Sequence, residues 1–263
     1  FLVENGFSEV INFPFSKDED SSIFIDNPLD SNKNYMRTNI QNSLLENLVY
    51  NENRQQDCIK LFEISDLYSL TNEINTIKKL GIIVSGRRGH NHKEFSKSLD
   101  KQYLIDLFNK IDFDIENQIT SIDRDKIKSK IKSPIFIIEI PIEKFTNKLN
   151  KTTFSSNKKY SHIKYIPISE FPSSYRDFSF SLKDSSKLDE LINTLEKYRP
   201  DNTKESYIFD IFENKKNNEI KLGYRIVFQS YKKTMTDNEI NTSVEKFLDV
   251  ILKINSVSLP GRD

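Results

Sequence analysis

The clearest pattern of hydrophobic and polar positions lies near the end of the chain. Four segments there have the alternation or apolar content of β-strands: 175–182 (YRDFSFSL), 206–213 (SYIFDIFE), 222–230 (LGYRIVFQS) and 256–259 (SVSL). The polar run 214–219 separates the second segment from the third, which predicts a hairpin.

Two helices are predicted between these strands. Asp184 offers an N-cap, Pro200 closes the first helix, and its apolar positions follow the i, i+3, i+4, i+7 rule: Leu188, Leu191, Ile192 and Leu195. Thr236 and Glu239 have the spacing of a capping box ahead of the second apolar stripe. The order strand, helix, strand, strand, helix, strand predicts a ferredoxin-like βαββαβ domain over 165–263.

The first 145 residues are less regular but also mix helices and strands. Strands are predicted at 8–15, 58–70, 80–86 and 135–142, and helices at 36–55 and 100–111. Strands joined by fewer than about a dozen residues must pair antiparallel, because a parallel crossover is longer. We therefore expect an α+β protein whose first domain, 1–145, is a mainly antiparallel sheet with helices packed on it.

A lysine-rich stretch joins the two parts. Between Lys126 and Lys164 ten lysines stand against two glutamates. This charge is typical of a solvated linker, and it is also compatible with a surface that attracts phosphates. In either case, the polar segment 146–164 is predicted to be a linker between the domains.

Composition excludes several classes of protein, including disulfide scaffolds and proteins with a membrane-spanning helix. The 39 basic and 39 acidic residues cancel, and Cys58 is the single cysteine, which excludes a disulfide scaffold and a cysteine-based zinc site. No apolar run reaches the ~20 residues of a membrane helix and no signal peptide opens the chain, so we expect a cytoplasmic protein without membrane contact. Because the chain starts at Phe1 without a methionine, we expect it to be the C-terminal part of a longer one.

No catalytic constellation is evident. Nucleotide loops of the GxxxxGKS or GxGxxG kind are absent, and the arginine pair in 86–89 fits a turn better than a phosphate site. His90 and His92 lie 70 residues before His162, too far for a recognisable metal motif, so they are interpreted as surface residues. The long helix within 36–55 has apolar positions that suit burial in its own domain or a subunit interface equally well.

An ordered set of motifs nevertheless resembles one family. GFSEVINFPF, NPLDSNKNYMRTNIQNSLLENLVYNENR, IKLFEISDLY, YLIDLF, FPSSYRDFSF, YIFDIFE, YRIVFQS and KTMTDNEIN are similar, in this order, to the C-terminal region of the β subunit of bacterial phenylalanyl-tRNA synthetase. Phe-Pro-x-x-x-Arg-Asp at 171–177, together with Thr-x-Thr-Asp-x-Glu-Ile-Asn at 234–241, is the most diagnostic pair.

The resemblance implies a class II synthetase-like, non-catalytic core followed by a ferredoxin-fold anticodon-binding domain. The implied partners are tRNA(Phe) and a catalytic α subunit in an (αβ)₂ heterotetramer that joins phenylalanine to its tRNA. ATP and Mg²⁺ would serve the holoenzyme, with no cofactor bound by this chain. In keeping with this, the strand Leu61-Phe62-Glu63 lacks the arginine that holds phosphate in a class II active site.

The resemblance also carries residue roles. Asp210 and Phe212 match an Asp that reads an anticodon base and an aromatic ring that stacks on it, and Lys221 takes the place of a small polar residue on the next strand. Arg176 and Asp177 are expected either to contact RNA or to form a structural ion pair. Residues of the long helix and its flanks would contact the α subunit: Arg37, Leu44, Leu48, Asn51 and Arg54.

Two departures from the family pattern stand out. The interval 112–134 lacks the usual His-Pro-Gly segment and glycine-rich strand pair, and the chain ends in LPGRD. A stand-alone RNA-binding or regulatory module derived from a synthetase is therefore kept as the alternative function.

Overall fold

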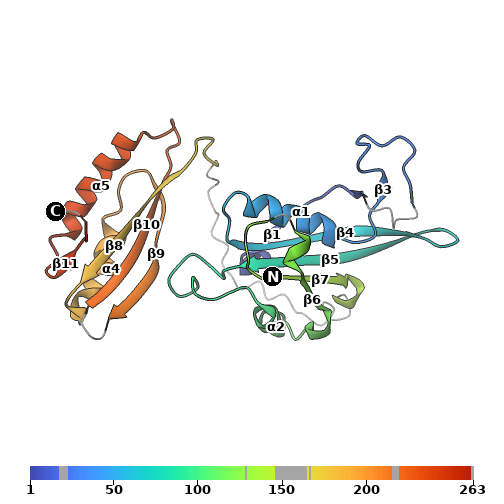
Figure 1. Ribbon diagram of the computed structural model, residues 1–263, viewed down its shortest axis with the longest axis horizontal. Helices are drawn as coiled ribbons and strands as arrows, with labels where there is room; N and C mark the ends of the chain where they lie inside the picture. The colour runs from blue at the N-terminus through green and yellow to red at the C-terminus, as the bar shows by residue number, and fades with distance from the viewer. Residues whose placement is uncertain (18–22, 128, 146–164, 166, 215–218, 262–263) are drawn as a thin grey trace. The chain divides into compact units, whose positions relative to one another are not determined.

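The computed structural model of this chain describes residues 1–17, 23–127, 129–145, 165, 167–214 and 219–261. Two compact units are present (Figure 1): Phe1–Arg88 with Lys97–Lys159, and Gly89–Ser96 with Tyr160–Asp263. The segment Gly89–Ser96, expected in the first domain, thus belongs to the second unit, where the His92 amide donates to the Ile208 carbonyl at 2.7 Å. The predicted linker 146–164 lies outside the described residues.

The first unit contains a five-stranded sheet in the order β1 (Ser8–Glu9), β4 (Cys58–Leu70), β5 (Ile74–Gly86), β7 (Ile135–Pro141), β6 (Ile119–Ile122). All neighbouring strands run antiparallel except β1 and β4, which are parallel. A separate pair is formed by β2 (Phe15–Ser16) and β3 (Tyr35–Met36). The prediction of a mainly antiparallel sheet is confirmed.

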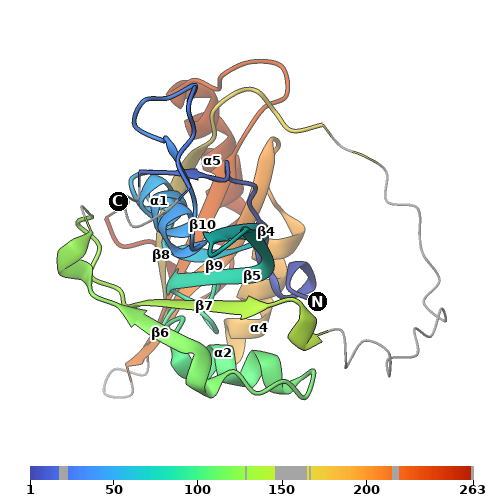
Figure 2. The same ribbon diagram turned by 90° about the vertical axis from the view of Figure 1, so that its right-hand side faces the viewer.

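Two helices described in this unit, α1 and α2, cover opposite faces of the sheet (Figure 2). Helix α1 (Gln41–Glu52) packs Leu44 and Leu48 against one face, and α2 (Lys101–Asn109) packs its own apolar residues against the other. Short 3₁₀ turns at Val3–Asn5, Glu116–Gln118 and Arg124–Lys126 complete the unit. Both faces of the sheet therefore form hydrophobic core.

Three expectations for this unit are wrong in detail. The strand predicted at 8–15 is broken after Glu9, and its apolar residues Ile11 and Phe13 are exposed rather than paired in the sheet. Strand β5 begins at Ile74 rather than Leu80, because its polar start pairs with β4 in a long hairpin. The lysine-rich interval 112–134 contains the unpredicted edge strand β6.

The second unit follows the order β8 (Ser174–Leu182), α4 (Leu188–Lys197), β9 (Thr203–Asn214), β10 (Glu219–Phe228), α5 (Asp237–Ile251), β11 (Val257–Ser258). A 3₁₀ turn, Ser185–Lys187, precedes α4. The sheet order is β11-β8-β10-β9 with every pair antiparallel, which confirms the ferredoxin-like arrangement. The predicted Thr236–Glu239 capping box is also confirmed at the start of α5.

Both helices of the second unit pack on one face of its sheet (Figure 1), where alternate strand residues such as Phe180, Leu222 and Ile226 are fully buried. The intervening residues point to the opposite face, which is called the open face below. Along the described part of the chain, no helix has both the length and the apolar character needed to cross a bilayer.

Candidate nucleic-acid interface

Strand register assembles the open face from three strands. Lys221 of β10 lies between Phe212 of β9 and Ser181 of β8, and Gly223 lies between Asp210 and Ser179. The register thus brings together three of the residues predicted to bind RNA: Asp210, Phe212 and Lys221. They occupy neighbouring positions although Asp210 and Lys221 are eleven positions apart in sequence.

These three side chains are exposed and form no polar contacts within the described residues. The Phe212 ring is 57% exposed, and Asp210 and Lys221 are exposed as well. None of the three forms a hydrogen bond or an ion pair with another residue in the described ranges. A free carboxylate, a free ammonium group and an open aromatic ring are the groups that recognise an unstacked base by its edge and its face.

The other predicted acid, Asp177, is engaged within the sheet. Its carboxylate accepts two hydrogen bonds from the Arg225 guanidinium, at 2.6 and 2.7 Å. The carboxylate raises the pKa of Arg225, and the guanidinium also donates to the Tyr207 hydroxyl. Because this pair is bidentate and shared with a third group, Asp177 has a positioning role in the sheet.

Arg176 lies on the opposite side of the same strand. Its guanidinium contacts Asp237 at 2.5 Å and Asn241 at 3.5 Å, both on α5. Arg176 and Asp177 therefore do not pair with each other, because adjacent strand residues point to opposite faces. Arg176 ties β8 to α5 and is separated from the open face.

A β-bulge shapes the middle of the open face. The register shifts between Gly223 and Tyr224, so that Phe209 is the extra residue of β9. A Cβ atom on Gly223 would lie 2.6 Å from the Phe209 ring, which shows that the ring covers this glycine. Glycine at 223 is needed because the aromatic ring lies directly on the backbone of β10.

Four open-face residues were not singled out from the sequence: Tyr175, Tyr207, Phe209 and Arg225. The Arg225 guanidinium lies 4.3 Å from the Tyr175 ring centroid and 5.7 Å from that of Phe209. Burial raises the pKa of the Tyr207 hydroxyl, which lies beside the Arg225 guanidinium. The alternation within 175–182 does put Tyr175 on the face opposite Phe178, so its outward position was available as a signal.

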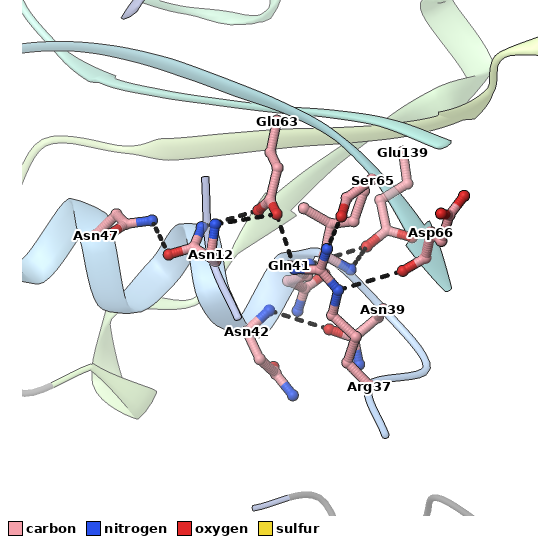
Figure 3. Close-up of polar contacts among 11 residues, drawn as sticks. Asn12, Arg37, Asn39, Gln41, Asn42, Asn47, Glu63, Ser65, Asp66 and Glu139 are labelled. Carbon is pink, nitrogen blue, oxygen red and sulfur yellow. Dashed lines mark hydrogen bonds and ion pairs between the residues drawn. The ribbon is translucent and has the colours of Figure 1, made fainter. Parts of the chain in front are cut away.

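The first unit contains a buried polar network instead of an open site (Figure 3). Arg37 and Glu63 are both 2% exposed, and the guanidinium contacts the carboxylate at 2.9 Å. Arg37 also donates to Ser65, and the amide groups of Asn12 donate to Glu63 at 3.3 and 2.8 Å. The carboxylate of the Leu61-Phe62-Glu63 strand is therefore saturated by protein donors.

A second carboxylate fixes the start of α1. Glu139 of β7 accepts hydrogen bonds from the backbone amides of Ile40 and Gln41 at 2.7 and 2.9 Å (Figure 3). Its carboxylate also contacts the Lys79 ammonium at 3.3 Å. These amides would otherwise have no partner, and the negative charge complements the positive end of the helix dipole. Glu139 thus determines where α1 begins on the sheet.

The residues predicted to contact a partner subunit are mostly buried within the unit. Arg37, Leu44 and Leu48 are at most 2% exposed, so their expected role as contact residues is corrected to a role in the core. Asn51 is half-buried and donates to the Asn47 carbonyl, while Arg54 is exposed and stacks on Tyr50 at 3.3 Å. The apolar pattern of α1 left a core role and an interface role equally open, and the interface role that the resemblance implied does not fit these three buried residues.

The exposed side of α1 borders a groove of about 670 Å³. Apolar and charged residues share its lining: Phe15, Lys33, Leu45, Val49, Tyr50 and Ile127. A search for three or more His, Cys, Asp or Glu side chains able to hold a metal ion found none within the described ranges. The open face of the second unit and this groove are the two surfaces with unused functional groups that we consider further.

Comparison with known protein families found a matching family model in each of the two units. Residues 1–116 match the model of the phenylalanyl tRNA synthetase beta chain CLM domain, and residues 169–259 match that of the ferredoxin-fold anticodon binding domain. The second match covers β8 to β11 and hence the whole open face.

Similar curated proteins are phenylalanine–tRNA ligase beta subunits. Those of Buchnera aphidicola from Acyrthosiphon pisum, Helicobacter pylori and Fusobacterium nucleatum are 26, 27 and 28% identical to this chain over 96, 97 and 95% of its length. The chain spans 36% of the length of each of these relatives. Both matched domains and the named relatives agree along the chain, and together they support its identification as a region similar to part of a phenylalanine–tRNA ligase beta subunit.

Proposed function

We propose that this chain is the part of a phenylalanine–tRNA ligase β subunit that binds the tRNA anticodon and docks on the catalytic α subunit. The reaction would be the ATP-dependent attachment of phenylalanine to tRNA(Phe) in the cytoplasm. ATP and Mg²⁺ would act on the α subunit, in an (αβ)₂ assembly. The first unit would have the class II synthetase-like fold and would position the partner without doing chemistry itself.

One observation carries the RNA part of the proposal: the unpaired Asp210 carboxylate lies beside the exposed Phe212 ring on the open face. An acceptor next to a stacking surface suits a base whose edge presents N–H donors. Lys221 adds a cation directly across from Phe212, within reach of an RNA backbone. The match of this unit to an anticodon-binding domain supports the same assignment.

The exposed side of α1 is the proposed docking surface for the α subunit. Its groove presents Tyr50, which is 57% exposed, next to Leu45 and Val49. Tyrosine is one of the residue types that dominate the energetics of subunit interfaces. Arg54, stacked on Tyr50, is the one member of the predicted contact set that is exposed.

The RNA assignment is tested with an anticodon stem-loop bearing GAA and one with a scrambled anticodon, at a fixed moderate salt concentration. We expect the chain to prefer GAA by about tenfold, or ~1.4 kcal/mol. Asp210→Ala should abolish the preference. Asp189→Ala is the matched control, because it removes the same charge from an exposed position on α4. Equal binding of both loops with a steep salt dependence would overturn the anticodon role.

The docking assignment is tested by co-purification with the α subunit. Tyr50→Asp should weaken the complex by at least about tenfold, since it places a charge in the centre of an apolar contact. Tyr198→Asp, an equally drastic change at an exposed tyrosine of the second unit, should leave the complex intact. Equal complex formation by both variants would exclude the α1 groove as the docking site.

A further inference from the structure

The open face has a second aromatic position that the anticodon assignment does not use. Tyr175 of β8 is 54% exposed and lies across from Val227, whereas Phe212 lies across from Lys221. Lys221 and Val227 are six positions apart on β10, which corresponds to about 20 Å along the strand. The two rings therefore mark opposite ends of the open face, and between them Phe95 and His90 contact the Phe209 and Tyr207 rings.

One side of the Tyr175 ring is supported by a neighbouring cation. The Arg225 guanidinium lies 4.3 Å from its centroid, and Asp177 fixes that guanidinium through two hydrogen bonds. Tyr207 adds a third constraint on the same guanidinium. A ring backed by a rigid planar cation keeps its orientation before a ligand arrives, which lowers the entropy cost of stacking.

The charge of this cluster favours a base over a phosphate. Arg225 is neutralised by the bidentate Asp177 carboxylate, so little net charge remains to attract a phosphate. The exposed part of the tyrosine ring offers an aromatic surface of the kind on which any base can stack. At the other end of the face, by contrast, Lys221 has no carboxylate partner among the described residues.

We propose that Tyr175, supported by Arg225 and Asp177, is a second base-stacking site that holds a nucleotide outside the anticodon triplet. This inference rests on the proposed anticodon role, because it assumes that Asp210 and Phe212 hold the triplet. The ligand is the base of a single-stranded nucleotide in the same loop. The span of about 20 Å is too long for adjacent nucleotides, which lie about 3.4 Å apart along a stacked strand.

Binding of the whole chain to the GAA stem-loop tests this site. Tyr175→Ala should weaken binding about fivefold or more, the equivalent of ~1 kcal/mol for one stacked base. Tyr175→Phe keeps the ring and should bind like the unsubstituted chain. Tyr198→Ala removes an exposed tyrosine at the end of α4, away from the open face, and should have no effect on binding.

A fluorescence readout separates stacking from loss of structure. The chain contains no tryptophan, so Tyr175→Trp introduces a single reporter. Its emission should be quenched when the stem-loop binds, whereas that of Tyr198→Trp should not change. Lack of quenching at position 175, with binding intact, would overturn the proposal and would point to another occupant of this surface, such as a protein.

Abasic nucleotides then identify the base. We expect the effect of Tyr175→Ala to vanish when one loop position outside the triplet lacks its base, as in a double-mutant cycle. Persistence of the effect with every abasic loop would refute stacking. The anticodon role is judged separately: if Asp210→Ala abolishes the GAA preference while Tyr175→Ala is silent, only the second site fails. If the unsubstituted chain shows no GAA preference, the anticodon role fails first.

Discussion

The buried ion pair between Arg37 and Glu63 gives the sharpest test of how the first unit is stabilised. Among the described residues, Arg37→Met leaves the buried Glu63 carboxylate with Asn12 as its donor, and Glu63→Leu leaves the guanidinium with Ser65 and one backbone carbonyl. Breaking a buried pair by removing one partner costs about 3–5 kcal/mol. Each single variant should therefore lose a large part of the roughly 5–15 kcal/mol by which folded proteins are commonly stable.

The double variant should behave differently. Replacing both charges by apolar side chains of similar volume is often neutral or stabilising, by about 1–4 kcal/mol relative to the pair. Here Asn12 and Ser65 would lose their partners, which offsets part of that gain by about 1–3 kcal/mol. We expect the Arg37→Met/Glu63→Leu protein to be more stable than either single variant.

Calorimetry of the whole chain measures this, because the two units can unfold in separate transitions. For a unit of this size, 3–5 kcal/mol corresponds to a loss of roughly 10 °C or more in the melting temperature of the first unit. Arg54→Met removes an exposed arginine of the same unit and should change stability by less than about 0.5 kcal/mol. If the double variant loses as much as the two single variants together, the pair is not coupled and the reasoning is refuted.

Three further predictions concern single positions. The hydrogen bond from Lys233, and to a lesser extent those from Thr236, lower the pKa of Glu239 from 4.5 to about 2. Because the pKa is lower in the folded than in the unfolded state, Glu239 stabilises the fold above about pH 4.5. This contribution disappears as the pH falls toward 2. Glu239→Gln should thus lower the melting temperature at pH 7 and progressively less below pH 4.5, and a constant gap would contradict this. Gly86 has φ +93° and a Cβ there would lie 1.9 Å from the Asp57 carbonyl oxygen, so Gly86→Ala should cost on the order of 3 kcal/mol in denaturant unfolding. Gly223→Ala should push the covering aromatic ring off β10 at a cost of about 1 kcal/mol, with NMR shifts of that ring as the check; unchanged shifts would show that the ring has room.

Local chemistry in the sequence determined most of the second unit. Alternation along 175–182 and 222–230, the polar turn between β9 and β10, and the Thr236 capping box each specify an element through interactions a few residues apart. The ferredoxin-like order follows from those elements. For the same reason, the predicted RNA residues on β9 and β10 lie together, since a hairpin fixes its own register.

Tertiary structure alone decided which side of each element is used. The pattern of α1 could not distinguish a core from a subunit interface, because both bury apolar side chains, and the packing of Leu44 and Leu48 resolves this in favour of the core. Asp177 was indistinguishable from Asp210 in sequence, yet only Asp177 meets an arginine, which lies 48 residues further along the chain. Such pairs depend on contacts between distant segments, and no local pattern encodes them. The sequence thus determines the elements and their order, while the packing of distant segments decides which of their side chains remain free to bind a partner.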